Sequence, residues 1–142
     1  MYTRDESKKI RQEFWTSFGR DFPRKWILYD TKIKELELKF TFTNEFAQVS
    51  LDVISSDDVI RSYYFEKLVS LRNILLDEYL SEAIFEDSYL LPEGKVISRL
   101  YVQLEQVNIH NKKDWPKVQH FLNQEMDKLE EFFIEYKDYL EA

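Results

Sequence analysis

The stretch from residue 33 to residue 54 constrains the fold of this chain more than any other, because apolar and polar residues alternate along most of it. The apolar positions are Leu36, Leu38, Phe40 and Phe42, followed after Asn44 and Glu45 by Ala47, Val49, Leu51 and Val53. Side chains of a β-strand point to opposite faces with a period of two. The pattern therefore predicts a long β-hairpin with one apolar face and one wet face, which needs helices on its apolar side only.

Helical periodicity flanks this hairpin on both sides. Apolar residues recur at spacings of three and four in residues 4–20, in residues 57–80, and in about 26 residues that start near Asp114. Thr3 and Glu6 have the spacing of a capping box before the first of these helices. Further strands are predicted for residues 26–29, residues 83–85 and residues 96–105.

The resulting order of elements is α-β-β-β-α-β-β-α, with short connections throughout. A chain of 142 residues has the size of one domain with one hydrophobic core. We therefore predict a single α+β domain over residues 1–142. It would contain an antiparallel-rich sheet of about five strands and three helices packed on one face of that sheet.

Composition excludes several classes of function. The chain has no cysteine, which rules out disulfides, a thiol nucleophile and cysteine metal sites. Its formal net charge is −7, and residues 40–142 alone carry −10, so nucleic acid is disfavoured as a partner.

The charged amino terminus lacks an apolar signal core, and no apolar run has membrane-spanning length. We expect a cytoplasmic protein with no membrane partner.

Signatures of catalysis are absent from the sequence. The two histidines, His110 and His120, are ten residues apart, which is not the spacing of a helical zinc pair. With only Gly19 and Gly94, the chain has no phosphate-binding or dinucleotide-binding loop. We therefore expect no cofactor and no bound metal, and we favour a protein that is not an enzyme.

One alternative is a divergent nuclease. The order α-β-β-β-α-β resembles the core of the PD-(D/E)xK nuclease fold, and Glu37 and Lys39 match its Glu-x-Lys motif. Residues two apart on a strand share a face, so Glu37 and Lys39, with Asp30 nearby in the sequence, could bind Mg²⁺ and orient a water molecule. Charged residues at such positions are more often cross-strand ion pairs.

A second alternative is binding of single-stranded nucleic acid. Positive charge and an aromatic ring occur together at Arg24, Lys25 and Trp26. Proteins that bind single strands attract the phosphate backbone with positive charge and stack the bases on aromatic rings. A few surface charges near a turn more often only keep a protein soluble. The sequence leaves this choice open.

Four segments resemble a known family. They are FWTSFG at residues 14–19, WILY at 26–29, ISRLY at 97–101 and VNIHNKKDWP at 107–116. They are similar to the bacterial family called domain of unknown function 4268, over most of the chain. The resemblance implies a small standalone protein of a kind whose relatives also follow nuclease-like domains in larger proteins. It supplies no catalytic residues, and in the family pattern the positions of Asp30 and Glu37 are not acidic.

These observations together favour a non-enzymatic interaction or accessory domain that acts through protein–protein contacts. The expected binding residues lie on the polar sheet face (Arg99, Tyr101 and Gln103) and in the loop before the last helix (Asn108 and His110). The partner protein is not specified by the sequence. We also expect a homodimer, with its surface formed by aromatic residues outside the helical stripes, namely Tyr63, Phe65, Phe132 and Tyr139.

Overall fold

The structure is a computed structural model and describes residues 2–142. Within this range, four α-helices and one short 3₁₀-helix surround a single four-stranded sheet. The elements in chain order are α1 (Arg4–Asp21), β1 (Leu36–Phe42), β2 (Phe46–Val53), α2 (Asp58–Ser70), α3 (Arg72–Glu78), β3 (Ile84–Leu90), β4 (Val96–Glu105), η1 (Lys112–Asp114) and α4 (Trp115–Glu141). The predicted α+β class with an antiparallel sheet is confirmed.

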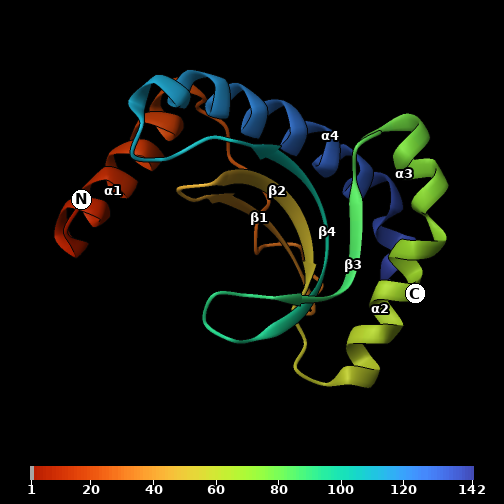
Figure 1. Cartoon of the computed structure of the whole chain (residues 1–142). Coiled ribbons are helices and arrows are strands. Elements are labelled where there is room, and N and C mark those ends of the chain that lie inside the picture. Colours follow the sequence, from red (N-terminus) through yellow and green to blue (C-terminus); the bar gives the residue numbers. More distant parts are fainter. Residues whose placement is uncertain (1) are drawn as a thin grey trace.

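The sheet has the strand order β1-β2-β4-β3, and every neighbouring pair is antiparallel. The predicted central hairpin is present, because Leu38 of β1 lies opposite Leu51 of β2. Leu51 also lies opposite Leu100 of β4, so the two central strands come from two different hairpins. The chain crosses from one hairpin to the other through α2 and α3 (Figure 1).

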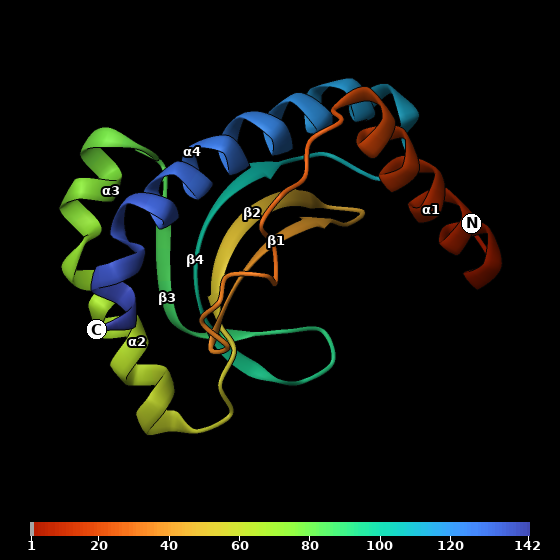
Figure 2. The same ribbon diagram turned by 180° about the vertical axis from the view of Figure 1, so that it is seen from behind.

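The sheet is strongly curved, and the helices lie along its convex side (Figures 1 and 2). Helix α4 runs the length of this side, with α1 beside its amino-terminal end and α2 and α3 beside its carboxyl-terminal end. The apolar residues of the strands face these helices and are buried with the apolar stripe of α4. The core includes Leu38, Val49, Leu51, Leu100, Leu122, Met126 and Leu129.

An aromatic cluster around Phe14 joins three elements. The Phe14 ring of α1 meets Phe42 of β1 edge-on at 4.8 Å between centroids, and it meets Trp115 of α4 edge-on at 5.3 Å. Edge-to-face aromatic pairs at such distances contribute stabilisation beyond the area they bury. The cluster thus fixes α1 against both the sheet and the long helix.

The strand predicted for residues 26–29 does not form, which is why the sheet has four strands and not five. Leu28 has a φ of +49°, in the left-handed region that interrupts an extended strand. The Ile27 amide donates to the carboxylate of Glu130 in α4, at 2.6 Å, and not to a neighbouring strand. Only the Leu28 carbonyl pairs with the sheet, where it accepts from the amide of Leu38 at 2.9 Å.

The helix predicted for residues 57–80 is two helices, α2 and α3, so the described chain has four helices where three were expected. The break is at Leu71, whose φ of −96° and ψ of 5° lie outside the helical region. Its amide bonds to the carbonyl of Leu68, three residues back, which tightens the last turn of α2. Leu68 before the break and Leu75 after it are both buried in the core.

Asp57 caps α2, with its Oδ1 accepting from the amides of Val59 and Ile60 at 2.9 and 3.2 Å. Asp57→Ala is therefore expected to lower the free energy of unfolding by about 1 kcal/mol, because two helix amides lose their acceptor. Urea denaturation measures this change. The control is Ser56→Ala, one residue earlier and also exposed, which should change stability by less than about 0.5 kcal/mol. An equal effect of the two changes would contradict a capping role.

Candidate functional site

The polar face of the sheet is concave and buried, whereas the sequence predicted a wet face. Gln48 and Ser50 are fully buried, and Asp52 and Arg99 are only 1% and 2% exposed. The reason is tertiary: the sheet curls around this face, and the connection between β3 and β4 folds beneath it (Figure 1). A register shift in the β3–β4 pairing, between Glu86 and Tyr89, accompanies this bend.

Arg99 of β4 is the centre of a polar network on this concave face. It donates from Nε and Nη2 to the two carboxylate oxygens of Asp52 on β2, at 2.7 and 2.8 Å. Its Nη1 donates to Oε1 of Gln48 at 2.8 Å, and its guanidinium lies 4.3 Å from the centroid of the Tyr89 ring. Burial lowers the pKa of Arg99, but the hydrogen bonds and charge of Asp52 outweigh burial and raise it overall.

Tyr101 extends the network toward β3. Its hydroxyl donates to Oε1 of Glu86 at 2.5 Å. Burial, followed by this hydrogen bond to a carboxylate, raises the pKa of Tyr101 above its usual range, so the phenol stays protonated. Gln103, the third residue expected on this face, accepts from Gln48 and is partly buried. The structure therefore brings Arg99, Tyr101 and Gln103 together, but largely inside the molecule.

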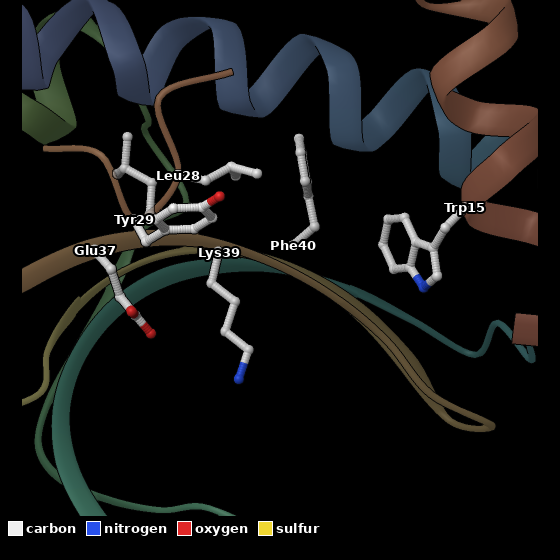
Figure 3. A pocket seen from close by; sticks show the side chains of 7 residues that line it. Trp15, Leu28, Tyr29, Glu37, Lys39 and Phe40 are labelled. Atoms are coloured by element: carbon white, nitrogen blue, oxygen red, sulfur yellow. The ribbon is translucent and has the colours of Figure 1, made fainter. Parts of the chain in front are cut away.

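A second site lies at the outer edge of β1, where a pocket of about 280 Å³ is open to solvent (Figure 3). We call it the β1-edge pocket; it is lined by Trp15, Leu28, Tyr29, Glu37, Leu38, Lys39 and Phe40. The aromatic and aliphatic side chains lie on the helix side of the strand, whereas Glu37 and Lys39 point to the concave side (Figure 3). Tyr29 is 83% exposed.

The backbone of β1 is available at this edge. The Thr43 amide donates to the Phe46 carbonyl, and the Ile54 amide donates to the Glu35 carbonyl. The backbone N–H and C=O groups of the odd-numbered β1 residues therefore bond to β2, and those of the even-numbered residues point away from β2, toward the free edge. The outward amide of Leu38 is taken by the Leu28 carbonyl. In residues 2–142, no segment outside β1 bonds to the outward amide of Phe40.

The three residues of the nuclease hypothesis come from two segments, Asp30 from the loop before β1 and Glu37 and Lys39 from β1 itself. Asp30 lies in an exposed ion pair with Lys32, at 2.7 Å, and Lys32 lowers the pKa of that carboxyl. Glu37 and Lys39 lie on the concave side of β1 (Figure 3). Across residues 2–142, no group of three or more His, Asp or Glu side chains is placed to hold a metal ion.

The basic residues of the single-strand hypothesis are partly occupied within the molecule. Arg24 pairs with Asp127 and, at 2.8 Å, with the buried carboxylate of Glu130, both on α4. The Arg24 guanidinium also lies 4.1 Å from the centroid of the Trp26 ring. These contacts fasten the segment before β1 to the long helix.

Asn108 and His110 brace the loop before η1. The Asn108 side-chain oxygen accepts from the amide of His110 at 2.9 Å, and the His110 ring stacks on Tyr2 at 4.4 Å. Nε2 of His110 lies 3.0 Å from the Ser7 hydroxyl of α1. Asp114 directly precedes α4, but its carboxylate accepts from the Asn108 amide at 2.9 Å and makes no cap hydrogen bond to α4.

Two of the four aromatics expected on a dimer surface are inside the core. Phe65 is buried, and Phe132 is fully buried against Tyr79 and Tyr136. Phe65 on α2 and Phe132 on α4 lie outside the apolar stripe that the sequence predicted for each helix, and both are nevertheless buried. Tyr63 and Tyr139 remain about half exposed near the carboxyl terminus. The homodimer stays a prediction.

The sequence reasoning missed several residues of the polar network. Asp52, Gln48, Tyr89 and Glu86 were not predicted as site residues, although Gln48 and Asp52 occupy polar positions of the alternating pattern. Arg99 was predicted as a site residue, but its pairing with Asp52 and Gln48 follows only from the position of β2 beside β4. An arginine and an aspartate at polar positions of two central strands are the signal that could have found them.

The fold and these sites define an antiparallel α+β domain that has a closed polar network on one sheet face and an open strand edge. None of the helices in residues 2–142 has the length and apolar character needed to cross a membrane. The chain belongs to the family described as Domain of unknown function (DUF4268), whose family model matches residues 10–137. No curated protein and no solved structure matches the chain.

Proposed function

We propose that this protein is a non-enzymatic accessory domain that binds a partner protein at the outer edge of β1. An extended segment of the partner would add to the sheet beside the β1-edge pocket. The outward backbone of Phe40 is the observation that carries the proposal, because an unpaired strand edge is a template for another strand. The polar network around Arg99 supports a structural role for the concave face, since its charges are already paired.

A contact within the protein's own chain supports this mode of binding. The Leu28 carbonyl accepts from the Leu38 amide on the same edge, and the Leu28 side chain lines the pocket. A partner strand would continue this pairing toward Phe40. Its side chains alternate between two faces, so every second one would enter the aromatic part of the pocket.

The pocket indicates the chemistry of the partner segment. Its volume of about 280 Å³ and its Trp15 and Phe40 walls suit one large aliphatic or aromatic side chain. On the concave side, the same segment would meet Glu37 and Lys39, which have opposite charges (Figure 3). We therefore expect a short extended segment with one large apolar residue flanked by polar ones.

A displayed library of short peptides, selected on the immobilised protein, tests this proposal. Selected peptides should share one large apolar residue, and Tyr29→Ala should weaken their binding about tenfold, as expected when a well-placed aromatic contact is lost. Because Tyr29 is 83% exposed, the change should leave stability nearly unaltered. Val59→Ala, at a position that is 79% exposed on α2, is the matched control and should bind like the wild type.

Amide hydrogen exchange gives an independent measurement on the same complex. Bound peptide should slow exchange of the Phe40 amide, because that amide gains a backbone acceptor. Peptides that bind equally to the wild type and Tyr29→Ala, and that leave Phe40 exchange unchanged, would contradict the proposal. Enrichment of a peptide copied from this chain, with dimers in light scattering, would identify a second copy as the partner.

A further inference from the structure

One side of helix α1 is positively charged and adjoins the β1-edge pocket. Arg4, Lys8 and Arg11 are spaced by four and three residues, and Trp15 follows after four more. Residues at these spacings lie on the same side of a helix. The three charged side chains are exposed, and Trp15 is half-buried. We call this side of α1, formed by Arg4, Lys8, Arg11 and Trp15, the basic face.

Trp15 joins the basic face to the β1-edge pocket. Its indole lines that pocket, and its ring centroid is 6.1 Å from that of Phe40. Figure 3 shows Trp15 at the α1 side of the pocket. The same side chain lines an open hollow of about 740 Å³ on α1, together with Lys8, Arg11, Gln12 and Thr16. A segment that leaves the pocket past Trp15 therefore meets two cations, and no acidic side chain of residues 2–142 lines this hollow.

The cations of the basic face are not neutralised by their neighbours. Within residues 2–142, none of the three forms an ion pair. Of the nearby acidic residues of α1, Glu6 belongs to the capping box, and Glu13 pairs with Lys112 at 2.8 Å. Asp5 borders the face, so three positive charges stand against one negative charge. The face therefore attracts an anionic group.

The distance along α1 fits a short extended segment. Arg11 and Lys8 lie four and seven residues before Trp15, which is about 6 and 10 Å along the helix at 1.5 Å per residue. An extended chain advances about 3.3 Å per residue. Side chains about two to four residues beyond one that packs on Trp15 therefore come level with these cations.

We propose that the basic face binds acidic residues of the partner segment, about two to four positions from its large apolar residue. This inference rests on the proposed binding at the β1 edge and adds the charge of the partner. Carboxylates pair well with Arg and Lys side chains. The free strand edge favours a polypeptide over a nucleic acid, because its amides and carbonyls pair with another peptide backbone. The attraction is local, since residues 40–142 carry −10.

Two displayed libraries that differ only in charge test this proposal. Each peptide has eight randomised residues and a tail of four residues at either end, all glutamate in one library and all glutamine in the other. Selection on the immobilised protein should favour the glutamate library. Its best peptide should bind about three- to tenfold more tightly than its copy with a glutamine tail, as two exposed ion pairs of ordinary strength would give. High salt should reduce this difference.

Variants of α1 locate the effect on the helix. The double change Lys8→Gln with Arg11→Gln should bring the two peptides to the same affinity, and it should not weaken the glutamine-tailed peptide. The matched control is Lys9→Gln with Lys117→Gln, which removes two exposed charges outside the basic face and should keep the difference. Loss of the difference in the control as well would overturn the proposal, because only net charge would then matter.

The remaining outcomes separate this inference from the proposed function. Peptides that bind at the β1 edge with equal affinity for either tail, and that are weakened by Tyr29→Ala, would overturn the inference and support the proposed function. Failure of both libraries to yield a peptide sensitive to Tyr29→Ala would overturn both. A thymidine oligonucleotide of twelve nucleotides that binds the basic face more tightly than the glutamate-tailed peptide would replace the acidic segment with nucleic acid.

Discussion

Asp52→Ala is expected to lower the free energy of unfolding by about 3–5 kcal/mol, because it breaks a buried ion pair. Asp52 and Arg99 form a two-point ion pair with both side chains at most 2% exposed. Removal of the carboxylate leaves the guanidinium buried without its counter-charge, and its hydrogen-bond donors lose their acceptors. The concave face around Gln48 and Tyr89 is then expected to lose its order first.

Guanidinium chloride would screen the charges, so urea denaturation at constant salt is the suitable measurement. Asp21→Ala is the control, because it breaks the exposed Arg20–Asp21 pair at 3.2 Å and should change stability by less than about 1 kcal/mol. The double change Asp52→Leu with Arg99→Met should recover a large part of the loss, because it removes both charges together. A loss below about 1 kcal/mol for Asp52→Ala would show that the pair is not buried in solution.

Phe14→Ala is expected to have a comparable effect, about 3–5 kcal/mol, through loss of packing and not of charge. Phe14 is fully buried, and its ring contacts aromatic rings of β1 and α4 as well as its helix neighbours. Removal of the ring leaves a cavity where three elements meet. The melting temperature should fall by roughly 10–15 °C for a domain of this size.

Differential scanning calorimetry measures the change, with Tyr29→Ala as the exposed aromatic control that should leave the melting temperature within about 2 °C. Phe14→Leu should cost clearly less than Phe14→Ala, since most of the volume is retained. Equal melting temperatures for Phe14→Ala and the wild type would contradict the aromatic cluster as the joint between α1 and the sheet.

The local elements were predictable because their signals are local. The alternation of residues 33–54 specifies a hairpin whatever lies around it, since the strand period is a property of the backbone. The capping box of Thr3 and Glu6 forms as expected, and Pro116 takes its place in the first turn of α4. The strand predicted for residues 26–29 does not form, because the Ile27 amide donates to the buried carboxylate of Glu130 on α4 and not to a neighbouring strand.

The candidate sites were less predictable than the elements. The period of two along the strand correctly assigns Arg99 and Tyr101 to the polar face of the sheet. It also predicts that this face is exposed to solvent, whereas both side chains are buried. Their burial depends on the curvature of the sheet and on the β3–β4 turn, which lies beneath the face. The nuclease and single-strand hypotheses used residues close in sequence. In the structure Asp30 pairs with Lys32, two residues away, whereas Arg24 pairs with Glu130 of the distant helix α4.

By itself, the sequence determined the hairpin, the amphipathic helices, the α+β class and the family, because periodicity, capping and shared segments are written along the chain. Only the tertiary structure decided that β2 lies beside β4, and that pairing creates the ion pair of Asp52 and Arg99. It also decided which edge of the sheet stays open. The physical reason is that strand order and curvature arise from contacts between distant segments, and no local pattern encodes those contacts.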